Sequence, residues 1–335
     1  MHCENIRIAY TLTEIRSLIV ASGGLAVSET FNHLVAARTA LEFDFFGGWQ
    51  PSDIDLFQSF QTSAHPVAGK IVDFMGIETT ASLHPWAAHM SGTVIGGIPI
   101  PSDNLRAEAI EYFATFDAFR RALPSGRFSA AELGASYAPW SCVCAVLARR
   151  ANLRAHVTAV EASSFLFGLI PGHLAENGVT TQNCDIRLIK GAVAARRTTL
   201  YFPVVGSAGE NGGQASSERK QLDYVGRKVE HEPVQGLPLA EILDRPMDLV
   251  HIDIQGVEAD VARSGIDILN KRVKALFIGT HSRKIEGELL ELFHANGWQL
   301  LRERPTTYSY EPSRPDIVGW TTRDGGQYWV NPRDI

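Results

Sequence analysis

Carboxylates follow several apolar stretches of this sequence at points where the chain turns. Glu132 stands in AELGASYAPWSCV (131–143), Glu161 ends AHVTAVE, and Asp253 lies near the end of MDLVHIDI. Each apolar stretch has the length of a buried strand. Ligands of mostly parallel sheets bind outside the carboxyl ends of the strands. We therefore expect these three carboxylates to contact a ligand.

The segment 131–143 has the position of a cofactor loop, yet its one glycine is Gly134. A dinucleotide loop needs several glycines, because pyrophosphate lies against backbone amides at a helix N-terminus. Pro139 removes one such amide here. S-Adenosyl-L-methionine carries no phosphate, and it needs one close backbone approach together with carboxylates for its ammonium group and its ribose diol. Glu132 is predicted to contact the ammonium group and Glu161 the diol.

Structural interpretations of the same loop stay open at the level of sequence. Glu132 could cap a backbone amide instead of binding a ligand. Pro139 suits the first residue of a helix. Trp140 could pack that helix onto the sheet or border the cofactor. Only the three-dimensional structure of the loop can decide between these alternatives.

His281 and Asp253 are the predicted catalytic residues. His281 ends the strand VKALFIGTH, which follows the strand of Asp253, so the two side chains should lie together at one sheet edge. A histidine there could take a proton from a hydroxyl, a role that contributes roughly 10²- to 10⁴-fold to a rate. A hydrogen-bonded structural histidine is the alternative, and Asp253 is the second choice for the proton acceptor.

Glu258 and Asp260 lie just after Asp253 at the expected start of a helix. Acids favour helix N-termini because of the helix dipole. They could also be read with Asp253 as oxygen ligands of Mg²⁺. No Asp-Asp pair accompanies them, and both could face away from Asp253 on the helix, so the sequence predicts no metal.

The order of apolar segments predicts an α/β fold. From residue 125 short strands alternate with helices, which is typical of a doubly wound, mostly parallel sheet, and two C-terminal segments predict antiparallel strands. Residues 125–335 are the predicted cofactor-binding domain. Residues 1–124 are predicted to be an irregular accessory region that shapes the substrate site, with helices at 28–44 and about 103–123.

Composition and charge limit the kinds of binding partner and the cellular compartment that we expect for this protein. The 335 residues carry a net charge of −6, and basic residues form no long stripe, which argues against nucleic acid. No uncharged apolar stretch reaches the length of a membrane span, and no signal peptide is apparent, so we expect a cytoplasmic protein. Four cysteines do not predict a disulfide framework. The sequence leaves open whether the protein forms a homo-oligomer.

Several motifs resemble the FkbM family of S-adenosylmethionine-dependent methyltransferases. That family has a D/E-x-G-A-N-x-G opening, an acid after the second strand, an N-N stretch before the third strand, and a K-I-D-V-E-G-x-E motif after the fourth. This chain offers ELGASYA at 132–138, Glu161-Ala162, AENGV at 175–179, GAV at 191–193 and HIDIQGVE at 251–258. The similarity covers about 127–300 in the right order.

The resemblance implies a class I methyltransferase-like seven-stranded sheet and O-methylation of a sugar, a glycan or a related natural product. It implies contacts to S-adenosyl-L-methionine from the following residues: Glu132, Gly134, Ala135, Ser136, Tyr137, Glu161, Ala162, Ala192 and Asp253. The acceptor would be a small molecule or a saccharide.

Two rival functions stay open. A nicotinamide-dependent oxidoreductase could use the same kind of sheet, although the expected glycine pair is missing. A non-catalytic protein that binds the methyl donor or a glycan is the other rival. Gln255 and Gly279 encourage it, because acids are common at these positions in the family.

Overall fold

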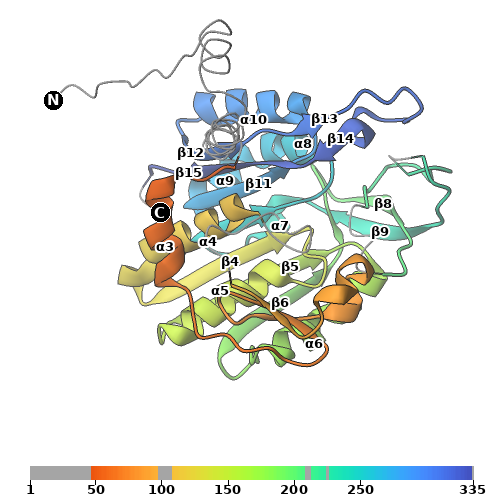
Figure 1. The fold of residues 1–335 in the computed structure, drawn as a ribbon. Helices are drawn as coiled ribbons and strands as arrows, with labels where there is room; N and C mark the ends of the chain where they lie inside the picture. The colour runs from red at the N-terminus through yellow and green to blue at the C-terminus, as the bar shows by residue number, and fades with distance from the viewer. Residues whose placement is uncertain (1–46, 97–107, 208–212, 224–225, 334–335) are drawn as a thin grey trace, which may run out of the picture. The chain divides into compact units, whose positions relative to one another are not determined.

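A seven-stranded sheet organises the part of the chain that the computed structural model describes, residues 47–96, 108–207, 213–223 and 226–333 (Figure 1). These residues belong to one compact unit, Phe46–Ile335. The predicted helix at 28–44 lies outside the described residues. Across the sheet, the strand order is β12 (Gln299–Arg304), β15 (Gly325–Val330), β11 (Ala275–Thr280), β10 (Leu249–Ile252), β4 (Arg127–Leu133), β5 (Arg154–Glu161) and β6 (Cys184–Lys190).

Six strands of this sheet run in one direction, and β15 runs against them between β12 and β11. Antiparallel pairing therefore occurs at the C-terminal end of the chain, as predicted. This mostly parallel order with one reversed strand confirms the predicted class I methyltransferase-like fold. Among the helices of the described residues, none has the length and apolar character that a membrane crossing needs.

Helices cover both faces of the sheet, and successive strand residues pack into two different cores. In β4, Ala130 joins one core and Ala131 the other, and Leu249 and Val250 alternate in the same way in β10. The alternation follows from the two-residue period of a strand that is buried on both faces. One core includes α4 (Ala109–Ala122), α5 (Pro139–Arg150) and α6 (Ser164–Glu176). The other includes α7 (Leu239–Ile242), α8 (Glu258–Ser264), α9 (Ile266–Arg272) and α10 (Arg283–Ala295).

Three smaller sheets lie outside the main one, and the sequence did not predict them. Their strands are β2 (Glu78–Thr80), β1 (Lys70–Asp73) and β3 (Thr93–Ile95) in one; β7 (Ala192–Val193), β9 (His231–Leu237) and β8 (Thr198–Pro203) in another; and β13 (Thr307–Tyr308) with β14 (Thr321–Arg323) in the third. Most are too short to display a clear alternation. The expectation of an irregular accessory region is therefore wrong for residues 70–95.

The region before residue 125 also contributes to the core of the main sheet. Helix α3 (Ile54–Ser59) packs Phe57 against Phe116 of α4, with ring centroids 6.2 Å apart. Trp49 and Phe57 belong to the same hydrophobic core as the strands β4 and β5. The domain boundary after residue 124 stays a prediction.

Gly134 ties the loop after β4 to the end of β10. Its φ of +82° lies in the left-handed region, and a Cβ atom there would lie 1.8 Å from the carbonyl oxygen of Asp253. The backbone N–H of Asp253 donates to the carbonyl of Leu133 over 2.8 Å. The close approach expected for this glycine is therefore made by the protein backbone itself, which leaves no room for a side chain.

Gly134→Ala is expected to destabilise the fold by roughly 3 kcal/mol or more, because the new methyl group adds an overlap with Asp253 to an unfavourable φ. Urea unfolding followed by circular dichroism measures the change. Gly287→Ala is the control, since Gly287 is exposed on α10 with open space around it, and it should stay within about 1 kcal/mol of the wild type. Equal stabilities of the two variants would contradict the explanation.

Candidate active site

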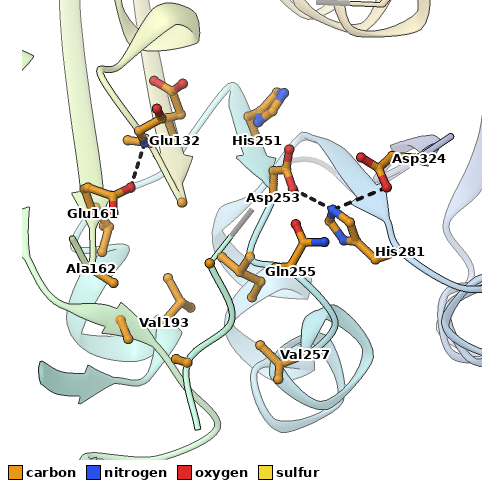
Figure 2. Close-up of a pocket in the computed structure, with 18 of the residues that line it drawn as sticks. Glu132, Glu161, Ala162, Val193, His251, Asp253, Gln255, Val257, His281 and Asp324 are labelled. Atoms are coloured by element: carbon orange, nitrogen blue, oxygen red, sulfur yellow. Dashed lines mark hydrogen bonds and ion pairs between the residues drawn. The ribbon is translucent and has the colours of Figure 1, made fainter. Parts of the chain in front are cut away.

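A cavity of about 490 Å³ lies at the carboxyl ends of β4, β5, β10 and β11 (Figure 2). Its volume is in the range of small-molecule sites. The ten residues predicted for the site all line it: Glu132, Gly134, Ala135, Ser136, Tyr137, Glu161, Ala162, Ala192, Asp253 and His281. The fold thus brings together residues that lie up to 149 positions apart in the chain.

Glu132 caps the helix that follows its strand. Its two carboxylate oxygens accept hydrogen bonds from the backbone N–H groups of Trp140 (3.0 Å) and Ser141 (2.7 Å) at the start of α5. Burial raises the pKa of this carboxyl group, against the lowering effects of nearby His251 and of these hydrogen bonds. The capping interpretation therefore describes Glu132 in this structure, although the residue also borders the cavity.

Glu161 is held at the end of β5 by two backbone groups. Its carboxylate accepts from the N–H of Ser136 over 2.7 Å and from the N–H of Ser163 over 2.6 Å. Burial raises its pKa to about 7, and these hydrogen bonds oppose the rise. The buried hydroxyl of Ser136 has no hydrogen-bond partner among the described residues. A polar ligand at this point would find both an acceptor and an unpaired hydroxyl.

Tyr137 lines the cavity, but its side chain is engaged elsewhere. The ring is buried, and its hydroxyl lies 3.1 Å from Nε2 of His84. Next to the Glu161 side of the cavity the lining residues Ala135, Ala162 and Ala192 have small side chains. The structure therefore leaves the phenol of Tyr137 directed toward His84, and space beside Glu161 is bounded by methyl groups.

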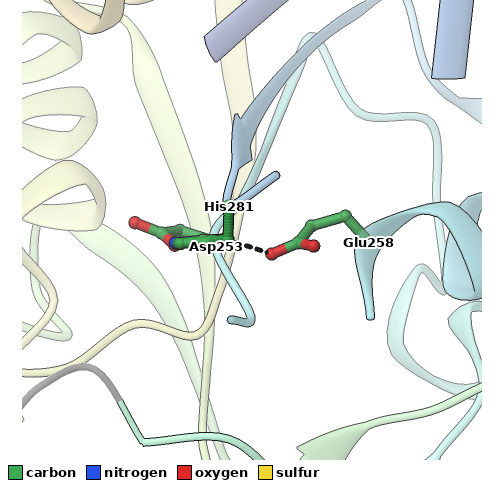
Figure 3. A group of neighbouring side chains, drawn as sticks. All are labelled: Asp253, Glu258 and His281. Atoms are coloured by element: carbon green, nitrogen blue, oxygen red, sulfur yellow. Dashed lines mark hydrogen bonds and ion pairs between the residues drawn. The ribbon is translucent and has the colours of Figure 1, made fainter. Parts of the chain in front are cut away.

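Asp253, His281 and Glu258 form a chain of charged groups (Figure 3). Nε2 of His281 lies 3.2 Å from a carboxylate oxygen of Asp253, and Nδ1 lies 2.6 Å from one of Glu258. His281 and Glu258 are buried, while the side chain of Asp253 is 47% exposed. The predicted contact between Asp253 and His281 is thus present, and Glu258 is the partner that orients the imidazole.

Electrostatics favour a protonated His281 in this chain. Burial lowers its pKa, but the charges of Glu258 and Asp324 and the hydrogen bonds to Asp253 and Glu258 outweigh burial, so the pKa lies well above its ordinary value. Burial raises the pKa of Asp253, and the hydrogen bond and charge of His281 reverse this, so its pKa is lowered. The pair is therefore an imidazolium beside a carboxylate at neutral pH.

Of the two acids after Asp253, only Glu258 differs from its expected position. Glu258 does not face away, because its carboxylate accepts from the N–H of Gly256 and contacts His281. Asp260 does face away: its side chain is 74% exposed and forms an ion pair with Arg263. Helix capping alone explains Asp260 but not Glu258.

Asp253, Glu258 and His281 place possible metal-binding atoms within 4.8 Å of one another. In this arrangement, however, Glu258 and Asp253 face different nitrogens of the imidazole. One ion bound to His281 through one nitrogen could not also take both of these contacts, since the two ring nitrogens point in different directions. The sequence-based prediction of no metal stays a prediction.

A buried polar network beneath the cavity was not predicted. One carboxylate oxygen of Glu111 accepts from the indole N–H of Trp140 and lies 3.1 Å from Nε2 of His251. The rings of Trp140 and His251 are stacked with centroids 5.3 Å apart. Trp140 therefore both packs α5 onto the sheet and borders the cavity. The two-residue spacing of His251 and Asp253 could have found His251, whereas no local signal marks Glu111.

Segments far from the strand ends supply the other walls. Arg227 comes from the connection between β8 and β9, and Thr321, Arg323 and Asp324 come from β14 and the turn after it. Asp324 lies 4.0 Å from Nε2 of His281. No sequence motif predicted these residues, because only the tertiary fold brings them to the cavity.

Comparisons with known proteins agree with a methyltransferase. No protein-family model matches the chain. The chain is 27% identical over 266 residues to a protein of Jannaschia sp. (strain CCS1) described as "Putative methyltransferase", covering 78% of this chain and 93% of that protein. With the strand order, this relative supports the methyltransferase part of the sequence-based resemblance. The protein has a class I methyltransferase-like fold and is similar to that methyltransferase.

Solved structures show more distant similarities. Methyltransferase FkbM from Methylobacillus flagellatus KT matches with a TM-score of 0.40 and 13% identity, over 61% of this chain and 44% of that chain. A protein from Pyrococcus horikoshii described as a "putative RNA methyltransferase" matches with a TM-score of 0.34 and 11% identity, over 68% and 85%. The prediction of no nucleic-acid partner stays a prediction.

Glu161 should make stability depend on pH. Its raised pKa means that the unfolded chain loses this proton near pH 4.5 and the folded chain near pH 7, so folding stability decreases between those values, by about 3 kcal/mol. In Glu161→Gln this decrease should vanish. The measurement is the difference in unfolding free energy between wild type and variant at about pH 5 and about pH 8.

The variant's amide satisfies the two backbone donors less well, so its absolute stability is lower and only the pH dependence is diagnostic. Glu291→Gln, at an exposed position of α10, should leave the pH dependence of the wild type unchanged. A pH dependence that is identical in the wild type and Glu161→Gln would show that Glu161 titrates alike in folded and unfolded chains.

Proposed function

We propose that the protein is an S-adenosyl-L-methionine-dependent O-methyltransferase that acts on a hydroxyl of a sugar, a glycan or a related natural product. The observation that carries this proposal is the convergence of Glu161, the 134–137 loop and the Asp253–His281 pair on one cavity. A carboxylate beside small residues suits a nucleoside. A carboxylate–imidazolium pair suits a hydroxyl that loses its proton.

The residues around Glu161 fit the methyl donor. The carboxylate of Glu161 can accept both ribose hydroxyls in charge-assisted hydrogen bonds. The unpaired hydroxyl of Ser136 lies in the same loop and can bond to a polar group of the cofactor. When bound, S-adenosyl-L-methionine supplies the methyl group. The loop lacks a run of free amides for a phosphate, since the N–H of Ser136 is taken by Glu161 and Pro139 has none.

Asp253 is the preferred proton acceptor in this proposal. His281 already carries a proton at neutral pH, so the half-exposed carboxylate of Asp253 is the group able to accept one from the acceptor hydroxyl. His281 donates a hydrogen bond to Asp253, and Glu258 holds the imidazole in place. In this role Asp253 would take the proton of the hydroxyl, while the bound cofactor would supply the methyl group and leave as S-adenosylhomocysteine. Holding two reactants in line contributes roughly 7 to 11 kcal/mol to such a reaction.

Calorimetry and a methyl-transfer assay test the proposal together. The purified protein should bind S-adenosyl-L-methionine and should not bind NADH tightly. It should also transfer a labelled methyl group to at least one member of a panel of monosaccharides, glycans and hydroxylated natural products. Tight binding of NADH would favour an oxidoreductase. Binding of the methyl donor without transfer to any acceptor would favour a non-catalytic protein.

Glu161→Gln should weaken the binding of S-adenosyl-L-methionine by about tenfold or more, because an amide has one acceptor oxygen and no charge for the ribose diol. Calorimetry at about pH 8, where the wild-type carboxylate is ionised, measures the dissociation constant. Glu291→Gln should bind as the wild type does. Unchanged affinity in Glu161→Gln would place the ribose elsewhere.

Asp253→Asn should lower kcat by about 10²- to 10⁴-fold, since an amide cannot take the hydroxyl proton. The dissociation constant of S-adenosyl-L-methionine should change less than in Glu161→Gln, because the ribose diol is assigned to Glu161. Asp260→Asn is the matched control on the neighbouring helix and should retain full turnover. Full turnover of Asp253→Asn would leave His281 or water as the proton acceptor.

A further inference from the structure

Two segments outside the main sheet form part of the cavity wall. One is the connection between β8 and β9, which contributes Arg227, and the other is the β13–β14 hairpin with Arg323. Figure 1 shows both on the side toward which the arrow of β4 points, beyond the carboxyl ends of the strands. Neither segment carries a predicted cofactor residue. Under the proposed function, these walls face the acceptor.

Arg323 keeps guanidinium donors that its neighbours do not occupy. Its Nη2 lies 3.4 Å from one carboxylate oxygen of Glu108, and Nη1 of the buried Arg304 lies 2.7 Å from the other. One carboxylate thus serves two guanidinium groups. The side chain of Arg323 is 47% exposed, and its Nε and Nη1 have no partner among the residues that the structure describes.

Arg227 is anchored differently but also retains free donors. The buried carboxylate of Asp223 accepts from Nε of Arg227 over 2.7 Å and from its backbone N–H over 2.8 Å. The two Nη groups make no hydrogen bond within the described part of the chain. Arg227 also borders a second cavity of about 370 Å³ that shares Gly213 with the first. The anchor fixes the guanidinium where the two cavities meet.

Carboxylates gather around His281, where the acceptor hydroxyl is proposed to bind. Asp253 and Asp324 lie 3.2 Å and 4.0 Å from His281, whose other nitrogen faces Glu258, so three carboxylates surround one imidazolium. An anionic group of an acceptor would be repelled there and attracted to the arginines. A guanidinium with free parallel donors matches the two oxygens of a carboxylate or phosphate.

We propose that the acceptor, on the proposed function, is an anionic hydroxyl compound whose carboxylate or phosphate binds Arg323 and Arg227 while its hydroxyl lies at Asp253. The acceptor is then a uronate-like or phosphorylated sugar unit rather than a neutral sugar. The two arginines act in recognition and take no part in the transfer of the methyl group.

Equilibrium binding tests the proposal without requiring turnover. D-Glucuronate is compared with its neutral counterpart D-glucuronamide, and D-glucose 6-phosphate with D-glucose, by NMR titration with and without S-adenosylhomocysteine. The wild type should bind at least one anion about tenfold or more tightly than its neutral counterpart. The pair that shows the preference tells whether the group is a carboxylate or a phosphate.

Arg323→Gln and Arg227→Gln should each reduce the preference for the anion by about threefold or more, and the double variant should abolish it. Arg263→Gln is the control, because Arg263 pairs with Asp260 on α8 and does not line the cavity; it should keep the preference of the wild type. The affinity for S-adenosylhomocysteine should be unchanged in all three single variants.

Three results would overturn the proposal. The wild type could bind the anion and its neutral counterpart equally in both pairs, or the preference for the anion could survive in the double variant. The arginine variants could instead weaken the binding of S-adenosylhomocysteine, which would assign the guanidinium groups to the cofactor carboxylate. A failure of the proposed function is read separately, from absent cofactor binding or absent methyl transfer in the wild type, and it leaves the sugar titrations interpretable.

Discussion

The site depends on the parallel pairing of β4, β5, β10 and β11, which ends four strands at one edge of the sheet. The loop after β4 and the end of β10 touch there through Gly134 and the carbonyl of Asp253, too closely for any side chain. The loop that borders the cavity beside Glu161 is therefore fixed against the strand that carries Asp253. Any shift of β4 against β10 would move both halves of the cavity.

Buried charge is the second constraint on this edge. Removing a carboxylate from water is costly unless hydrogen bonds or opposite charges compensate. Backbone amides hold Glu132 and Glu161, whereas the imidazole of His281 holds Glu258 and Asp253. The two kinds of partner give the carboxylates different chemistry. Glu161 is an acceptor with a raised pKa of about 7, and Asp253 is an anion beside a cation.

The walls opposite the strand ends come from additions to the sheet. The connection between β8 and β9 places Arg227 at the cavity, and β14 with the turn after it places Arg323 and Asp324 there. On the proposed function, the guanidinium donors of the two arginines suit a substrate that carries an anionic group as well as a reacting hydroxyl. Loops and small insertions of this kind change the substrate of a fold while the sheet stays the same.

The sequence by itself determined the order of the seven strands of the main sheet after residue 125, because buried strands and amphipathic helices carry local periodicities. It also determined which strand-end residues meet, since parallel strands share one edge, and it placed His281 beside Asp253 correctly. Only the tertiary structure decided what each side chain does there. It turned Glu132 into a helix cap, buried Glu258 behind His281, and directed the hydroxyl of Tyr137 toward His84. It also brought Glu111 and Arg323 to the cavity from distant segments. These outcomes depend on side-chain direction and on contacts between residues far apart in the chain, for which a local pattern holds no signal.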